Sequence, residues 1–226
     1  MKEKGELKPR RDRIGITPAH LEQILYTMSF ENGGLRNWVI TLIGVIGMIR
    51  SGELLPSNET EFNPNLLPTR SHVHTDAKTR WVTLTLPATK TDRDGHGAKI
   101  TLPCMTEAEN LTEPLCTDSK CPACMLNLWL TSSIGTQQDH LFSTNGEPYK
   151  KSTYVNWLKQ TMQNLGVDRS LIGGHSLRIG GASAAHSAGL GPETIMMLGR
   201  WTSDAYQRYV NADIHVLAGH IRELAR

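Results

Sequence analysis

The sequence predicts a mostly α-helical domain with a small antiparallel β-sheet in its first half, an α+β fold. Apolar residues recur at helical spacing over most of the chain, and they alternate with polar residues in only two short segments, 81–86 and 98–102. No internal repeat or convincing linker divides residues 16–226, so we expect one domain there, preceded by a basic linker or arm over residues 1–15.

Capping residues and apolar periodicity place the helices. Thr17 is a good N-cap and Pro18 suits the first helical position, so a helix is expected to begin there. Leu35–Arg50 is apolar nearly all round, which predicts a central buried helix. Six further helices are predicted in the second half, over residues 121–132, 151–165, 175–188, 191–199, 203–210 and 213–225, with a loop over 135–150.

The two alternating segments predict a β-hairpin. Apolar residues occupy every second position of each segment, as in strands with one buried face. The polar segment 90–97 between them contains an Asp-Gly turn signal and predicts a long hairpin loop. Residues 54–76 are rich in Pro, Asn and Ser, and predict a loop with at most one short strand.

Composition narrows the class of protein. The 226 residues are 38% hydrophobic and 20% charged, which is typical of a globular domain. The longest apolar run, Trp38–Ile49, is too short to cross a bilayer, and the N-terminus has no apolar signal region. We therefore expect an intracellular protein without a membrane partner, located in the nucleus of a eukaryotic host and otherwise in the cytoplasm.

The net charge of +2 is weak evidence for a nucleic-acid partner, but basic residues gather at the N-terminus. They are Lys2, Lys4, Lys8, Arg10, Arg11 and Arg13, diluted by three acidic residues. This segment is either a solvated tail or an arm in which Arg10, Arg11 and Arg13 contact nucleic-acid phosphates.

All four cysteines fall within one short stretch of the chain. Cys121 and Cys124 have the spacing of a zinc-binding pair, and Cys104 and Cys116 add two thiols upstream. A second closely spaced pair is missing, and Cys124 begins an apolar helical pattern. The four thiols form either a zinc site or ordinary reduced cysteines of an intracellular protein.

Two short motifs have the chemistry to bind a phosphate. His175 and Arg178 lie three residues apart on a predicted helix, so they would share a face, and a guanidinium offers paired donors to two phosphate oxygens. Arg50 ends the central apolar helix, and Glu53 follows it closely enough to orient it. Taken singly, each motif is more typical of an ordinary surface pair than of a binding site.

A lysine and three aromatic residues complete the candidates. Lys90 lies at the tip of the first predicted strand, where a loop lysine can reach and protonate a leaving oxygen. Trp201, Tyr206 and Tyr209 lie shortly before the C-terminus, and a tyrosine becomes a nucleophile only when neighbouring bases or cations activate it. On their own, the lysine is typical of a solvated loop and the aromatic residues are typical of core packing.

The order of these groups is more specific than any one of them. An Arg, a Lys on a hairpin, a His-x-x-Arg on a helix, then a Trp and a Tyr, at this spacing, resemble the catalytic domain of the tyrosine recombinase (phage integrase) family over about residues 16–215. The strings His-Ser-Leu-Arg-Ile-Gly-Gly-Ala, Leu-Gly-Arg-Trp and Tyr-Gln-Arg-Tyr-Val are especially similar to recombinases of eukaryotic mobile elements, of the Crypton type. The resemblance implies the catalytic-domain fold of that family.

The resemblance also implies an activity. The chain would cut and rejoin double-stranded DNA through a 3′-phosphotyrosyl link, in site-specific recombination or in integration and excision of a mobile element. Tyr209 would be the nucleophile, Lys90 would protonate the leaving 5′ oxygen, and His175 would assist proton transfer at the nucleophile.

The remaining site residues would bind the phosphate. The resemblance implies that Arg50 and Arg178 hold the non-bridging oxygens of the scissile phosphate, with Glu53 bracing Arg50. Trp201 would take the position that is His or Trp in this family, where it packs and donates to the phosphate. Because arginines supply the positive charge, the implied reaction requires no cofactor and no metal.

The chain departs from the family pattern in two ways. Members usually carry the nucleophile nine residues after the His or Trp position, whereas Tyr209 follows Trp201 by eight, which leaves Tyr206 as an alternative nucleophile. Members also carry an N-terminal core-binding domain, which is expected to be absent here because only about fifteen residues precede the first predicted helix.

Two other functions share these sequence features. One is relaxation of DNA in the manner of a type IB topoisomerase, which acts as a monomer; the other is a captured transposon domain that only binds DNA. Recombinases instead assemble four protomers, and a last helix with one apolar face favours such a homotetramer on DNA. That face consists of Ile214, Leu217, Ala218, Ile221 and Leu224, and it docks either on a neighbouring protomer or on its own core.

Overall fold

The computed structural model of the chain describes residues 13–57, 62–76, 78–89, 97–106 and 116–208. Its helices are α1 (Pro18–Thr27), α2 (Gly34–Ile46), α3 (Ser51–Leu54), α4 (Pro122–Ser132), α5 (Lys151–Asn164), α6 (Ser176–Ser187) and α7 (Pro192–Gly199). Its strands are β1 (Val73–Thr75), β2 (Val82–Leu86), β3 (Ala98–Leu102), β4 (Ser143–Thr144) and β5 (Glu147–Pro148), and its 3-10 turns are η1 (Arg70–His72), η2 (Arg169–Leu171) and η3 (Asp204–Arg208).

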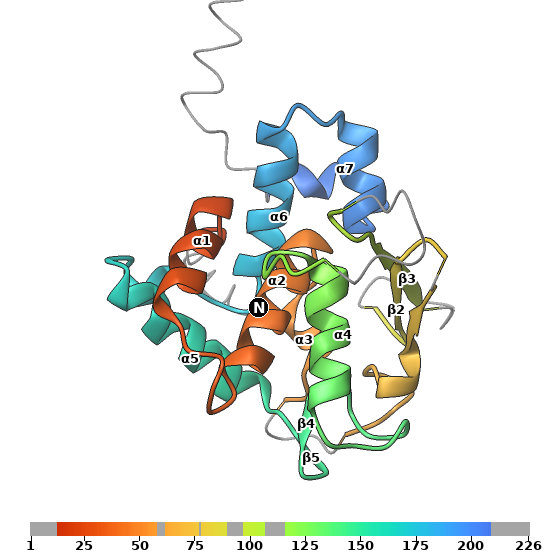
Figure 1. Cartoon of the computed structure of the whole chain (residues 1–226). Helices are drawn as coiled ribbons and strands as arrows, with labels where there is room; N and C mark the ends of the chain where they lie inside the picture. The colour runs from red at the N-terminus through yellow and green to blue at the C-terminus, as the bar shows by residue number, and fades with distance from the viewer. Residues whose placement is uncertain (1–12, 58–61, 77, 90–96, 107–115, 209–226) are drawn as a thin grey trace, which may run out of the picture.

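The prediction of a mostly helical domain with a small antiparallel sheet is confirmed. In Figure 1 the three-stranded sheet stands to one side of the helices, and β1, β2 and β3 are antiparallel neighbours in that order. Leu84 pairs with Ile100, so the alternating apolar residues of both strands face the core. Among the described residues, no helix is long and apolar enough to cross a membrane.

Helix α2 forms the centre of the core, as its sequence predicts. Nearly every residue from Asn37 to Val45 is buried, and the helix packs against α4 and α6. Small residues allow the contact with α6 to be close: a Cβ atom added to Gly181 would lie 2.1 Å from the carbonyl oxygen of Val45. The small residues after Arg178 thus let α6 lie directly against α2.

The predicted helix over Leu35–Arg50 is too long at its C-terminal end. The observed helix α2 ends at Ile46, because Gly47 caps it and Met48 adopts a left-handed conformation with a φ of 48°. The chain then turns and begins the short helix α3. In this α2–α3 turn, residues 47–50, the main-chain carbonyl groups of Gly47 and Met48 accept hydrogen bonds from arginine side chains.

The predicted loop over 135–150 contains a second small hairpin, β4–β5. Its turn is Asn145-Gly146, and both residues have positive φ values, of 53° and 81°. The Asn-Gly dipeptide is the standard signal for such a turn, but the strands that flank it are only two residues long and carry no alternating pattern.

The C-terminal predictions have mixed outcomes. The helix expected over 203–210 is the 3-10 turn η3, and the helix expected to begin at His175 begins one residue later, with His175 as its N-cap. The helix predicted over 213–225 lies outside the described residues.

Candidate active site

The first part of the candidate site is a clamped arginine at the start of α3. The Nη1 atom of Arg50 lies 3.0 Å from Oε1 of Glu53, and the other carboxylate oxygen accepts a 2.8 Å hydrogen bond from the main-chain N–H of Arg50. Both side chains are largely buried, at 15% and 7% exposure. The carboxylate therefore fixes the guanidinium and the first turn of α3 together.

The second part is Arg178, which lies in the core on α6 and is only 2% exposed. Its guanidinium donates to the carbonyl oxygen of Met48, at 2.8 Å, and to that of Gly199 at the end of α7. The same group lies over the ring of Trp201, 4.1 Å from the ring centroid. Arg178 thus joins α6 to the α2–α3 turn and to the segment that follows α7.

The prediction that His175 and Arg178 share one face needs refinement. His175 is exposed and stands at the N-cap of α6, whereas Arg178 is buried one turn further along. The residue before the histidine is nevertheless tied to the site, because the carbonyl oxygen of Gly174 accepts a 3.1 Å hydrogen bond from the main-chain N–H of Ser51. This bond fixes the beginning of α6 next to Arg50.

Sequence reasoning missed Arg200, which is the third arginine at the α2–α3 turn. It caps α7 in a left-handed conformation, and its guanidinium donates to the carbonyl oxygens of Gly47, at 2.9 Å, and of Met48, at 3.1 Å. Burial lowers the pKa of Arg200; the nearby carboxylate of Glu53 opposes this shift and the charge of Arg50 adds to it. The sequence did contain a signal for Arg200. In the family that the sequence resembles, the His or Trp position usually lies nine residues before the nucleophile; Arg200 lies nine residues before Tyr209, whereas Trp201 lies eight before it.

Trp201 and Tyr206, the aromatic residues after α7 that the structure describes, pack on each other. The ring centroids of Trp201 and Tyr206 are 6.2 Å apart, and Tyr206 is 6% exposed. Trp201 therefore contacts Tyr206 as well as Arg178, and the contacts of Tyr206 are those of a core residue.

Four of the predicted site residues are not among those that the structure describes. Lys90, Tyr209, Arg10 and Arg11 lie outside the described residues. Arg13 is described, and its guanidinium donates to the carbonyl oxygens of Ser170 and Ile172, so at this point the N-terminal segment lies against η2.

The four side chains at the α2–α3 turn are three guanidinium groups and one carboxylate. Such a cluster carries a net positive charge, and all of its members are wholly or partly withdrawn from water. Electrostatic attraction is stronger in such surroundings than in open solvent, so the cluster suits a phosphate group.

The chain has the catalytic-domain fold of the tyrosine recombinases. No family model and no curated protein matches the sequence, whereas several solved structures match the fold. XerA recombinase is 16% identical, with a TM-score of 0.64 over 96% of this chain and 67% of XerA.

Two complexes match over a smaller share of their own length. XerH site-specific recombinase, bound to a palindromic difH substrate after cleavage, is 14% identical with a TM-score of 0.60, over 87% of this chain and 48% of XerH. A lambda integrase dimer bound to a COC′ core site is 17% identical with a TM-score of 0.52, over 91% of this chain and 49% of the integrase. The chain thus spans about half the length of these two proteins.

Proposed function

We propose that residues 16–226 cleave and rejoin DNA strands through a 3′-phosphotyrosyl intermediate, in site-specific recombination or in integration and excision of a mobile element, with residues 1–15 as a linker or arm. The observation that carries the proposal is the convergence of three guanidinium groups on the α2–α3 turn, in a chain with this recombinase fold. A buried cluster of arginines is what a phosphodiester in transfer requires, since negative charge grows on its oxygens.

The proposed chemistry is a pair of phosphoryl transfers. The phenolic oxygen of Tyr209 attacks the scissile phosphorus, and the bond between phosphorus and the 5′ oxygen breaks. His175 takes the phenolic proton, and Lys90 gives a proton to the leaving 5′ oxygen. In rejoining, a 5′-hydroxyl attacks the phosphotyrosine and releases Tyr209, so the number of phosphodiester bonds is unchanged and no ATP is consumed.

Arg50 and Arg178 are the proposed ligands of the non-bridging phosphate oxygens. The clamp by Glu53 supports this role for Arg50, because a guanidinium that is already oriented costs little reorganisation when the transition state forms. For Arg178, the support is its position between the α2–α3 turn and Trp201, which fixes the plane of its paired donors.

Arg200 is proposed as a positioning residue. It shares the carbonyl oxygen of Met48 with Arg178, and so holds the end of α7 on the α2–α3 turn. The proposed nucleophile follows Arg200 by nine residues in the sequence, so we expect the contacts of Arg200 to influence how Tyr209 is positioned.

A nicked suicide substrate tests the proposal. The substrate is a pool of duplexes with a randomised core and a nick just beyond each cleavage position, so that a short 5′-hydroxyl fragment diffuses away and rejoining is blocked. We expect a protein–DNA adduct that survives denaturation, migrates slowly on a denaturing gel and disappears after protease treatment. Sequencing of the captured DNA then gives the target.

Other outcomes of the same assay separate the alternatives. A chain that shifts the duplexes on a native gel but forms no adduct with any of them is a DNA-binding module, which contradicts the proposal. Relaxation of supercoiled plasmid by a monomer, without strand exchange, identifies the topoisomerase-like activity instead.

We further propose that four copies assemble on DNA, each inserting its last helix into an apolar groove of the next. The groove lies between α1, α2, α6 and α7, and its lining includes Leu21, Val45, Ile46, Ala184, Ala188 and Leu198. Ile46 and Leu198 are half-exposed, so an apolar helix would cover them. The apolar face predicted over residues 213–225 has the right chemistry for this groove, and its attachment after α7 gives it access to a neighbouring molecule.

Truncation after residue 212 tests the assembly. The full chain is expected to sediment on DNA as a complex of several protomers, and the truncated chain as one protomer per site, with an unchanged melting temperature of the free protein. Two results together would indicate that the helix docks on its own core. The truncated chain would melt at a lower temperature than the full chain, and the full chain would also bind DNA as a monomer.

A further inference from the structure

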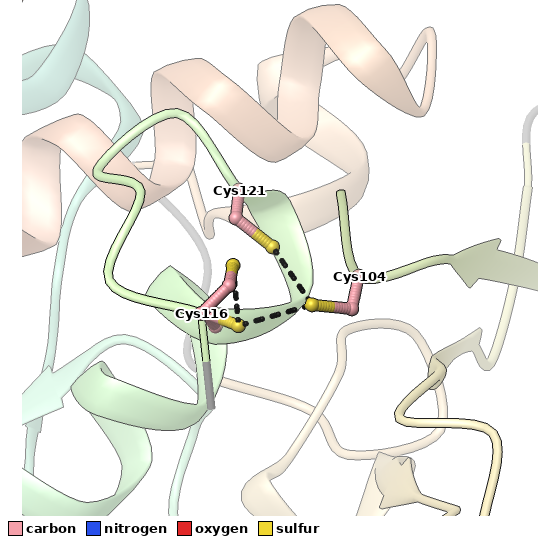
Figure 2. A group of neighbouring side chains, drawn as sticks. Cys104, Cys116 and Cys121 are labelled. Carbon is pink, nitrogen blue, oxygen red and sulfur yellow. Dashed lines mark hydrogen bonds between the residues drawn. The ribbon is translucent and has the colours of Figure 1, made fainter. Parts of the chain in front are cut away.

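Four thiol groups converge where β3 ends and α4 begins. Cys104 follows β3, Cys121 is the N-cap of α4, and Cys124 lies in the first turn of that helix. Cys116 comes from the connection that leads to α4. All four sulfur atoms lie within 4.8 Å of one another, and Figure 2 shows three of them, those of Cys104, Cys116 and Cys121, directed toward a common point.

The separations between the sulfur atoms are those of a metal site. The Sγ atom of Cys124 lies 3.3 Å from that of Cys116 and 3.6 Å from that of Cys104, which in turn lies 3.9 Å from that of Cys121. Four thiolates around one zinc ion, each about 2.3 Å from it, have sulfur atoms about 3.8 Å apart at the corners of a tetrahedron. A disulfide requires about 2.0 Å, so these separations do not correspond to S–S bonds.

The protein surrounds the four thiols as it would the ligands of a metal ion. The main-chain N–H of Met105 donates to the sulfur of Cys121 over 3.4 Å, which ties the segment after Cys104 to the N-cap of α4. Cys121 and Cys124 are buried, while Cys104 and Cys116 are partly exposed, which leaves a path for an ion.

The loop before α4 is fixed independently of any ion. The indole N–H of Trp38 donates to the carbonyl oxygen of Ser119 at 2.7 Å, which fastens the loop to α2. The main-chain N–H of Cys121 donates to the carbonyl oxygen of Asp118 at 2.9 Å and closes the turn before the Cys-x-x-Cys pair. The segment that carries Cys121 and Cys124 is therefore held in place by hydrogen bonds of the protein itself.

We propose that Cys104, Cys116, Cys121 and Cys124 bind one structural zinc ion with tetrahedral geometry. A tetrahedral set of four thiolates is typical of zinc, and with no position left for a water molecule the site is closed and structural. The ion would join the end of β3 to the start of α4. It would thereby fix the sheet whose β2–β3 connection contains Lys90, and this role does not depend on whether the chain cleaves DNA.

Metal analysis of the purified full-length chain tests the proposal without any variant. We expect one equivalent of zinc per chain by elemental mass spectrometry, and four thiols that react with a thiol reagent only after a chelator or a mercurial removes the ion. Chain refolded with Co²⁺ should show the intense thiolate-to-cobalt charge-transfer absorption of a tetrahedral sulfur site. Removal of zinc should lower the melting temperature.

Variants assign the ligands. Cys104→Ser and Cys124→Ser are expected to lose the zinc, whereas Cys116→His should keep it, because an imidazole can replace a thiolate ligand. The matched control is Met125→Ala: Met125 is buried beside Cys124, so this variant loses core packing but no ligand, and it should keep the zinc.

Several results would overturn the proposal. The first is a parent chain that contains no zinc even after folding in the presence of zinc, and whose four native thiols all react freely. The second is a chain that contains iron in place of zinc. The third is a protein mass lower by two hydrogens for each disulfide formed. Retention of stoichiometric zinc by Cys104→Ser and Cys124→Ser would equally exclude this ligand set.

Discussion

Replacing Tyr209 with Phe is expected to remove the covalent DNA adduct completely, while native-gel binding of the same suicide substrate stays within about two-fold of the parent. The substitution deletes only the phenolic oxygen, which is the atom proposed to form the bond to phosphorus. Binding is retained because the guanidinium groups that attract the phosphate are unchanged.

Tyr206→Phe is the matched control, because it deletes the same atom from the neighbouring tyrosine. Tyr206 packs against Trp201 and is nearly buried, so its variant is expected to form adduct at a rate within a few-fold of the parent. The reverse pattern, in which Tyr206→Phe abolishes the adduct and Tyr209→Phe does not, would make Tyr206 the nucleophile. The structure would then have to expose a residue that it now buries.

Local patterns predicted most of the helices and both strands of the main hairpin. Thr17 and Pro18 begin α1 as expected, and the alternation in 81–86 and 98–102 corresponds to β2 and β3. These features depend on neighbours in the sequence, which is why periodicity finds them. The end of α2 was misplaced for a different reason: Met48 adopts a positive φ, and no rule assigns that conformation to a methionine from its neighbours.

The site was predicted less completely than the fold, because it is made by contacts between distant segments. The sequence motifs named Arg50, Glu53 and Arg178, but Arg200 was overlooked because its contacts are to main-chain carbonyls more than 150 residues earlier. The cysteines are a similar case. Their spacing suggests zinc only weakly, and the approach of Cys104 depends on how the sheet packs against α4.

The second large effect is expected at Arg178. Arg178→Lys keeps the positive charge but loses the planar fork, so it can pair with only one of two phosphate oxygens. We expect the rate of adduct formation, under single-turnover conditions with saturating DNA, to fall by about 10²–10³-fold, the loss that follows removal of one donor aimed at developing charge. The measurement is made well below the melting temperature of the variant, so that loss of folded protein does not contribute.

The same substitution should also cost stability. Arg178 donates to the carbonyl oxygens of Met48 and Gly199 and stacks on Trp201, an arrangement that depends on the planar fork of the guanidinium. Because Arg200 still donates to Met48, the acceptor that a lysine is expected to leave unpaired is the carbonyl oxygen of Gly199, at a cost of about 1–3 kcal/mol. Arg70→Lys is the matched control for this effect. Arg70 is similarly buried and donates to Ser133 and Leu130, so its variant should lose comparable stability in urea unfolding.

The two variants separate catalysis from folding. If Arg178 binds the scissile phosphate, Arg178→Lys loses adduct rate by orders of magnitude, whereas Arg70→Lys stays within a few-fold of the parent at equal loss of stability. If both variants slow the reaction alike, Arg178 serves only to join α6 to the α2–α3 turn. Arg200→Lys then becomes informative. If Arg200 is a positioning residue, Arg200→Lys should lower the rate of adduct formation less than Arg178→Lys does. It should cost as much stability, because Arg200 also donates to the carbonyl oxygens of Gly47 and Met48 in the turn.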